Sequence, residues 1–422
     1  MKKYKILKDE FITIKNGKRL YRIKALKNFS NVKKNQEGGY VESYLNLSQE
    51  GNSWIYSDAK VYDQATVADD AQIFDNVEIY GKACVYGKAQ IYNSVRIYDT
   101  SRVYGHAQIY GNSRIYGNSR VCDNSKIYDR VRIYGNSEVH GNSQIYDKVR
   151  IYGNSWVYGN SWIYGSAQIY ENSQVRDRAQ IYDNARIYGD SQIYGNAKIH
   201  GHARVYDYAR VYKNAIVYQN AKIFGSAEIY DYAKIGGNAK ISRWARIYDK
   251  AEIFGNAEVS DIARVFGNSV VCENAKIYDS AEVFGNVKVC GDATVYGYAY
   301  LQYGYFNGDI KKNLIEYIAA SLNTYPANGK YILYKRVKKV DDGVYQSLYD
   351  NDFIYRDNEI IEVDADPDFM HSCGTGIHVS TPFYWRKGDT LIMVEVAIED
   401  IITCMHGKLR CKKVKVIGEV KI

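Results

Sequence analysis

Proline is scarce in this chain of 422 residues, which contains 3 prolines and 7 cysteines. Nearly every residue can therefore donate a backbone hydrogen bond, as a strand inside a sheet must. The number of cysteines is odd, and none forms a Cys-x-x-Cys pair or stands beside histidine at the spacing of metal ligands. We therefore expect no metal site, no cofactor and a reducing compartment.

Long apolar runs are also missing. The N-terminus has lysines but no apolar stretch behind them, which excludes a signal peptide. No window of the sequence approaches the roughly 20 apolar residues of a membrane-spanning helix. We expect no membrane contact and a cytoplasmic location, in a bacterium or a phage-infected host.

Positive charge is concentrated near the N-terminus. Residues 1–54 hold 12 Lys and Arg against 5 Asp and Glu, whereas residues 55–300 hold 28 against 26. A nearly neutral central region is not expected to bind nucleic acid through bulk charge. Nucleic acid is therefore expected, if at all, only at the basic N-terminal segment.

What the chain does contain is a six-residue repeat. From Ile55 to Tyr300, 246 residues form 41 units without insertion or deletion. The first position of each unit is Ile or Val and the fifth is Ala, Ser or Val, while the third is mostly Gly or Asp. Apolar positions six residues apart exclude an amphipathic helix, in which they recur every three to four residues.

Each unit is typical of a short strand followed by a corner. The order small, polar, aliphatic, aromatic, as in residues 197–200, alternates with period two, so the small and aliphatic side chains share one face. The Gly or Asp that follows tolerates the positive φ of a corner. Such units wind into a parallel β-helix, an all-β solenoid. We expect the flanking segments to cover its ends, because open strand edges recruit other chains.

The pattern resembles that of hexapeptide-repeat proteins, which form left-handed parallel β-helices with three units per coil. The resemblance implies a left-handed solenoid over residues 55–300, after a basic N-terminal cap over residues 1–54 and before a C-terminal helix and small α+β domain over residues 301–422. Residues 20–54 are similar to the entry segments of uncharacterised phage and bacterial members. The Gly38-Gly39 pair in this segment is expected to form a turn into the first coil.

The second position of each unit points outward and is usually tyrosine. Residues eighteen apart should stack, because three units complete a coil. Stacked tyrosines stabilise strands by about 0.2–1 kcal/mol per cross-strand pair, which is the structural interpretation. The functional interpretation is an aromatic face for a sugar chain, a protein surface or single-stranded nucleic acid. The binding candidates in one such column are Tyr98, Tyr116, Tyr134, Tyr152, Tyr170 and Tyr188.

Hexapeptide-repeat proteins are often acyltransferases, which place a histidine beside a loop between coils as a general base. Here no loop interrupts the repeat, and all its histidines lie inside ordinary units: His106, His140, His200 and His202. We interpret them as surface substitutions and expect no catalytic residue, with acyl transfer as the alternative function.

Residues 301–422 lack the repeat. Asp309 is expected to cap a helix whose apolar face covers the last coil, formed by Ile310, Leu314, Ile318 and Leu322. Strand-like runs then predict a compact α+β domain, at residues 331–337, 354–363, 390–398 and 414–422. The alternating acids from Glu362 to Asp368 lack the Gly and distal Glu of a calcium loop and indicate a solvated strand edge.

Residues 373–380 supply a second candidate binding site, comprising Gly374, Gly376, His378 and Ser380. They resemble the Gly-x-Gly-Ile-Tyr-Phe-Ala strand that cradles NAD in ADP-ribosyltransferases, and more closely Cys-Gly-x-Gly-Leu-His segments of uncharacterised phage-borne domains. The first resemblance implies an NAD-binding domain, although His378 stands where the transferases have a stacking tyrosine and no catalytic glutamate can be assigned. A site for another ligand or partner and a purely structural turn are the other interpretations.

The sequence thus predicts a non-enzymatic, elongated scaffold of bacterial or phage origin, with tyrosine-rich faces and a C-terminal recognition domain. Its expected partner is a protein or a polysaccharide, and self-association is open. Acyltransferase and ADP-ribosyltransferase-like activity are the alternatives.

Overall fold

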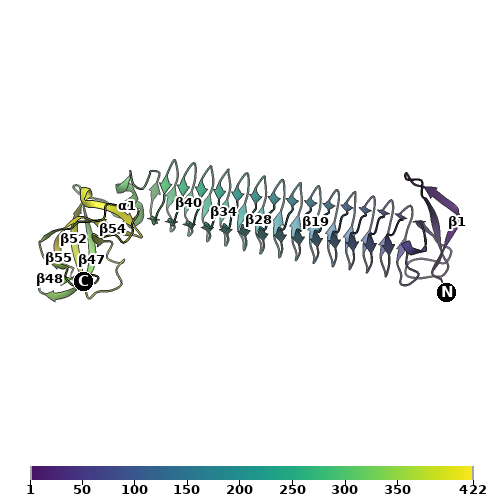
Figure 1. Ribbon diagram of the computed structural model, residues 1–422, viewed down its shortest axis with the longest axis horizontal. Helices are drawn as coiled ribbons and strands as arrows, with labels where there is room; N and C mark the ends of the chain where they lie inside the picture. The colour runs from purple at the N-terminus through teal and green to yellow at the C-terminus, as the bar shows by residue number, and fades with distance from the viewer. Residues whose placement is uncertain (1, 421–422) are drawn as a thin grey trace. The chain divides into compact units, whose positions relative to one another are not determined.

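The computed structural model describes residues 2–420 and confirms a parallel β-solenoid with a small antiparallel domain at its C-terminal side (Figure 1). The chain divides into two compact units, Met1–Gly225 and Ser226–Ile422. The six-residue pattern continues in both units.

In residues 1–225, two-residue strands recur every six residues from β4 (Trp54–Ile55) to β32 (Lys222–Ile223). Each strand pairs in parallel with the strand eighteen residues further on, as β11 (Arg96–Ile97) does with β14 (Arg114–Ile115). Three sheets result, beginning in this region with β4, β5 (Lys60–Val61) and β6 (Thr66–Val67). The predicted three units per coil are confirmed.

The core of the solenoid consists of the first and fifth positions of the units, whose side chains are fully buried. Burying one Ile or Val contributes roughly 2 kcal/mol before the cost of ordering the chain is subtracted. Serines at the fifth position are also buried, and Ser119 shows how they are satisfied: its Oγ donates to the carbonyl oxygen of Tyr116 at 2.9 Å.

The corners lie at the third position, as predicted, where residues adopt positive φ. Asp123 has φ 56° and Gly141, one coil later, has φ 73°. The carboxylate of Asp123 accepts a hydrogen bond from the Gly141 N–H at 2.9 Å. A Cβ at Gly141 would lie 2.7 Å from the carbonyl oxygen of Gly159. Asp therefore adds a bond between coils, whereas Gly avoids strain.

The N-terminal segment forms an antiparallel sheet that joins the solenoid. Its elements are β1 (Tyr4–Thr13), β2 (Arg19–Ala25), β3 (Glu37–Val41) and the short 3₁₀ helix η1 (Tyr44–Asn46). Strand β3 pairs in parallel with β5. The buried ammonium of Lys3 donates to the carbonyl oxygens of Glu50 and Ser53 at 3.1 and 3.0 Å. The Asn46 amide donates to two carbonyls of the first coils, whereas the buried Nε1 of Trp54 at the same edge has no hydrogen-bond partner among the described residues.

The expectation that Gly38 and Gly39 form a turn is wrong, because both lie inside strand β3. A Cβ at Gly38 would approach the carbonyl oxygen of Ile55 to 2.6 Å, and one at Gly39 would approach that of Ala59 to 2.4 Å. These glycines are therefore required by the close approach of β3 to the first coil.

In residues 226–422, the two-residue strands recur from β33 (Glu228–Ile229) to β45 (Tyr300–Leu301), followed by β46 (Tyr305–Phe306). Helix α1 (Leu314–Leu322) then covers the last coil: the N–H groups of Gln302 and Tyr303 donate to the Ala320 carbonyl at 2.8 and 2.9 Å. Asp309 does not cap this helix. Its carboxylate accepts from the N–H groups of two following lysines in the preceding turn.

The C-terminal domain consists of two antiparallel sheets. The larger has the order β49-β48-β47-β52-β55-β50 and the smaller β51-β54-β53. The predicted run 354–363 is divided by a turn, and the run 414–422 extends beyond the described residues. The strands are β47 (Lys330–Asp341), β48 (Val344–Gln346), β49 (Ile354–Arg356), β50 (Ile360–Glu362), β51 (Ile377–Val379), β52 (Thr390–Ala397), β53 (Ile401–Met405), β54 (Lys408–Cys411) and β55 (Lys413–Glu419), with the 3₁₀ helix η2 (Ile398–Asp400).

One disulfide links Cys272 and Cys290, whose Cα atoms lie 4.6 Å apart. The two residues occupy the second position in successive coils, which stacks them. Spacing rules for short motifs do not find this pair, and the bond is at odds with the reducing compartment expected from the sequence. Across residues 2–420, no helix is both long and apolar enough to cross a bilayer.

Candidate functional site

The six candidate tyrosines form one column, as predicted. Successive rings have centroids 4.8–4.9 Å apart and planes within 5° of parallel, from Tyr98 through to Tyr188. Offset stacking of this kind adds about 0.5–1.5 kcal/mol per pair beyond burial. The neighbouring rings therefore cover most of each aromatic face.

The column consequently presents ring edges and hydroxyl groups to solvent. Within the described chain these six hydroxyls have no hydrogen-bond partner. Burial raises the pKa of Tyr170 to about 12, and the pKa of Tyr152 is raised for the same reason. These two phenols thus remain neutral donors at physiological pH. A sugar ring or a base cannot stack on faces that neighbouring tyrosines already occupy.

His200 is a member of an aromatic column in the repeats. His200 is stacked between the rings of Tyr182 and Tyr218, with centroid distances of 4.6 and 5.8 Å. Its Nδ1 lies 3.8 Å from a carboxylate oxygen of Asp183, and burial lowers its pKa. In residues 55–225 and again in 226–301, every unit closes in the same short corner without an inserted loop.

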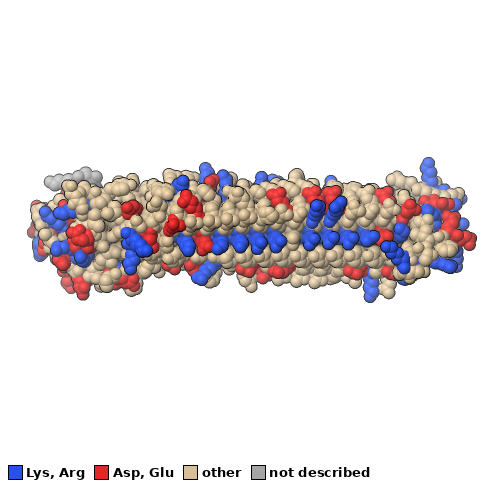
Figure 2. All heavy atoms as spheres, turned by 90° about the horizontal axis from the view of Figure 1, so that it is seen from above, with Lys and Arg blue, Asp and Glu red and all other residues tan. Residues whose placement is uncertain are grey.

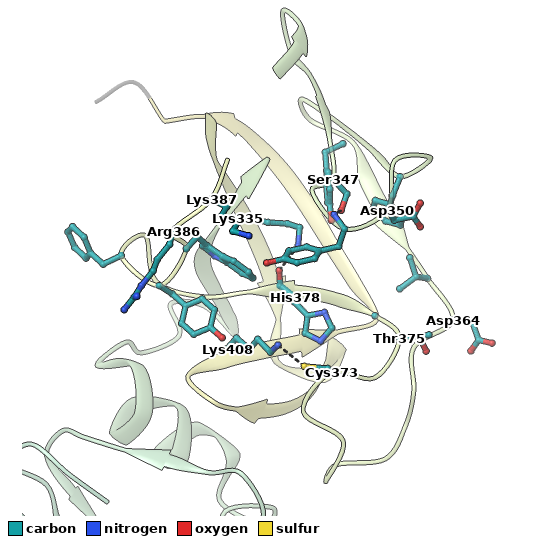
Figure 3. Close-up of a pocket in the computed structure, with 18 residues that line it drawn as sticks. Lys335, Ser347, Asp350, Asp364, Cys373, Thr375, His378, Arg386, Lys387 and Lys408 are labelled. Carbon is teal, nitrogen blue, oxygen red and sulfur yellow. Dashed lines mark hydrogen bonds between the residues drawn. The ribbon is translucent and has the colours of Figure 1, made fainter. Parts of the chain in front are cut away.

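The strongest candidate site is a cavity of about 1110 Å³ in the C-terminal domain, which we call the C-terminal pocket. Its floor comes from β47, β51 and β54, and its rim comes from the loops before β49 and β52 (Figure 3). Four cationic and two acidic side chains line it: Lys335, Arg386, Lys387 and Lys408 against Asp350 and Asp364. The site therefore carries net positive charge.

Lys335 is the buried cation of this pocket, with 5 % of its surface exposed. Its ammonium donates to the His378 carbonyl at 3.0 Å and lies 5.1 Å from the ring centre of Trp385. Burial lowers its pKa to about 8. Among the described residues no carboxylate pairs with it, although a buried charge normally requires a counter-charge.

His378 presents its ring to the centre of the pocket (Figure 3). Its Nε2 is buried and has no hydrogen-bond partner. Burial, together with the charges of Lys408 and Lys335, lowers its pKa to about 4. The imidazole is therefore neutral at physiological pH.

The other candidate residues of the segment 373–380 differ in whether they face the cavity. Gly376 lines the pocket, whereas Ser380 is fully buried and bonded through Oγ to the Gly407 carbonyl at 2.5 Å. A Cβ at Gly374 would lie 2.2 Å from the guanidinium of Arg410. Gly374 and Ser380 thus shape the wall, and only Gly376 and His378 face the cavity.

Arg410 holds the wall of the pocket in place. This guanidinium is almost fully buried and donates to the carbonyl oxygens of His371 and Asp368, and it lies 3.6 Å from the carboxylate of Asp366. The His371 ring lies 2.8 Å from the same carboxylate. The predicted acidic strand edge is therefore partly a folded loop anchored by a buried arginine. No group of three metal-ligating side chains occurs among residues 2–420.

Most residues that line the pocket were not identified from the sequence, among them Lys335, Trp385 and Lys408. Lys335 belongs to an alternating strand, whose period predicts an inward side chain at this position. Trp385 and Lys408 lie in a loop and after a turn, where no local pattern indicates the direction of a side chain.

The comparisons support the solenoid and no more. A family model described as YdcK Beta solenoid repeat matches residues 107–123 and 179–195. Both stretches lie in the repeats of the first unit, and no curated protein matches the chain. The chain is thus similar to β-solenoid repeat proteins, and the match assigns neither an activity nor a partner.

Proposed function

We propose that the protein is a non-enzymatic binding protein, in which the solenoid is a scaffold and the C-terminal domain is the recognition module. The ligand of this module is a small anion with a planar ring, such as a nucleotide. The observation that carries the proposal is Lys335, a buried ammonium without a protein carboxylate, at the base of a cavity.

The chemistry of the pocket supports this class of ligand. A phosphate provides the missing counter-charge for Lys335 and hydrogen-bond acceptors for Lys408. The rim offers exposed aromatic rings, Tyr349 and Phe383, that are free to contact a planar ring. The cavity volume is close to the upper limit of about 1,000 Å³ for small-molecule sites.

Calorimetric titration of the full chain with AMP, ATP and NAD tests the proposal. Lys335→Met should weaken binding of the best ligand at least about tenfold, because it removes the buried positive charge. Lys338→Met is the matched control, since Lys338 is exposed on the same strand. Absence of binding by all three compounds, or equal affinity of the Lys335→Met variant, would contradict the proposal.

The two enzymatic alternatives have separate readouts. Release of nicotinamide from NAD would favour ADP-ribosyl transfer, although no glutamate lines the pocket among the described residues. Turnover of acetyl-CoA that is lost in His200→Ala would favour acyl transfer. Either activity would overturn the non-enzymatic part of the proposal.

A further inference from the structure

A row of arginines follows one sheet of the solenoid in residues 1–225. These residues occupy the sixth position of every third unit, and all are exposed. We call them the arginine stripe: Arg96, Arg114, Arg132, Arg150, Arg186 and Arg204, with Gln168 at the one neutral position. Figure 2 shows Lys and Arg side chains aligned on the solenoid surface in a row one residue wide.

Neighbouring arginines of the stripe stand directly beside each other. Arg114 is the strand partner of Arg132, and Arg132 is the partner of Arg150. Adjacent strands lie ~4.8 Å apart, so a positive charge recurs at this interval along the sheet. Like charges on paired positions repel and destabilise a sheet.

Carboxylates of the protein do not neutralise the stripe. In the described part of the chain, Arg96 forms an ion pair with Glu78 at 3.4 Å, and no ion pair forms at the other five arginines. Asp147 and Asp183 lie in the adjoining corners and each accepts a backbone N–H of the next coil, from Gly165 at 2.9 Å and Gly201 at 3.0 Å. They keep their negative charge, but within the described residues neither forms an ion pair with an arginine of the stripe. The total charge of the repeats is therefore close to zero, although five arginines of the stripe form one row of positive charge without ion pairs to the rest of the described chain.

The tyrosine column runs beside the stripe on the same sheet. Arg132 and Tyr134 both point outward and flank the buried Ile133. Burial raises the pKa of Tyr116, while the guanidinium charges of Arg132 and Arg114 act in the opposite direction, which places these charges near its hydroxyl. The face thus offers parallel rows of cations and of neutral hydroxyl donors.

We infer that this face binds a linear acidic polysaccharide with one carboxylate on each sugar, a polyuronate. The arginines recur every ~4.8 Å along a straight line, so a carboxylate of an extended chain that lies along the stripe meets a cation wherever it faces the protein. The tyrosine hydroxyls then donate hydrogen bonds to carboxylate and hydroxyl oxygens of the sugars. This site is independent of the C-terminal pocket.

The geometry favours this occupant over other polyanions. Each strand of a DNA duplex winds around the helix axis and returns to the same straight line only after about 34–36 Å. The part of the stripe from Arg114 to Arg204 is straight and spans five coils, or ~24 Å. A duplex strand therefore does not follow the stripe over this length. Single-stranded nucleic acid is held mainly by stacking of its bases on aromatic faces, and here those faces are covered. A lipid surface would contact a broad area instead of a row one residue wide.

Binding of the full chain to de-esterified polygalacturonate, measured by biolayer interferometry, tests this inference. The triple variant Arg114→Gln/Arg132→Gln/Arg150→Gln should bind on the order of 100-fold more weakly, since each cation at an anionic surface contributes about fivefold. Binding of the unchanged protein should weaken steeply with added salt, and the triple variant should show a shallower dependence.

The matched control removes three positive charges that lie outside the stripe but also within residues 1–225: Arg102→Gln/Lys126→Gln/Arg178→Gln. Arg102 and Lys126 belong to the two other sheets. Normal affinity of this control supports the inference. Equal weakening of both triple variants, or equal binding of a carboxyl-reduced, neutral polymer, would overturn it. Tighter binding of oligothymidylate than of polygalacturonate would overturn the choice of a polysaccharide.

Discussion

The ammonium group of Lys408 lies 3.3 Å from the thiol sulfur of Cys373 at the wall of the C-terminal pocket. The Ser372 hydroxyl is 3.6 Å from the same sulfur. The Ser372 hydrogen bond and the Lys408 charge lower the pKa of the Cys373 thiol. Because the thiolate is the nucleophile, this exposed cysteine should react faster than an ordinary one at neutral pH.

We expect Lys408→Met to slow alkylation of Cys373 at neutral pH. Loss of the ammonium raises the thiol pKa, and the thiolate fraction falls about tenfold for each unit by which the pKa rises. Iodoacetamide labelling followed by peptide mass spectrometry measures the rate. Labelling of Cys84, which lies in the repeats, should not change. An unchanged rate at Cys373 would mean that Lys408 does not act on the sulfur.

The pH dependence of ligand binding should follow Lys335, whose pKa burial lowers to about 8. Its ammonium is charged below this pH and neutral above it. The affinity for AMP, whose phosphate is already fully ionised above neutral pH, should therefore fall as the pH rises through about 8. Calorimetry on both sides of this value measures the change, and Lys335→Met should show a flat profile.

The lowered pKa of Lys335 also predicts how the free energy of unfolding changes with pH. In the unfolded chain the lysine pKa is about 10.4, so between about pH 8 and 10 the unfolded state binds more protons than the folded state. The contribution of Lys335 to the free energy of unfolding should therefore rise with pH in this window. In urea titrations, the free energy of unfolding of the wild type minus that of Lys335→Met should increase with pH in this window; a difference independent of pH would contradict the assignment.

Substitutions at Gly141 should separate two effects at a corner: the backbone strain of a side chain at positive φ and the hydrogen bond that an aspartate forms to the next coil. Gly141→Ala should destabilise the fold by about 1–2 kcal/mol, because a Cβ is unfavourable at positive φ and would crowd the Gly159 carbonyl. Gly141→Asp should recover part of this loss, since an aspartate at this position accepts the N–H of the next coil, as Asp123 does. Thermal unfolding of the two variants checks the order.

The Cys272–Cys290 disulfide should be detectable as a cross-linked peptide in a non-reducing digest. Its removal in Cys272→Ala/Cys290→Ala should cost about 3 kcal/mol for a loop of this length. Cys404 and Cys411, which are buried and unpaired, should be recovered as thiols in the same digest. Recovery of Cys272 and Cys290 as thiols from non-reduced protein would show that the bond is not formed.

The solenoid was predictable from the sequence because every unit repeats one local rule. Ile or Val at the first position and a Gly or Asp corner at the third determine each strand, and eighteen-residue stacking follows from three units per coil. The register of the tyrosine column and the burial of the small fifth position were obtained in this way.

The remaining features depend on contacts between residues distant in sequence. The sequence predicts a turn at Gly38 and Gly39, since nothing local shows that β3 lies against the first coil. The buried environment of Lys335 depends on Trp385, fifty residues later in the chain. Short-range cysteine rules likewise could not find a pair that a whole coil separates.

The uniform register between coils makes the length of the repeat region adjustable. Each coil offers its successor the same backbone donors and acceptors and the same apolar layer, so a segment of eighteen residues inside residues 55–225 can be removed or duplicated and leave matching surfaces at the junction. Gene duplication and unequal recombination in such a sequence would change the protein by whole layers. The length of the repeat region can therefore change during evolution in steps of one coil, with no change to the residues that form the core of each coil.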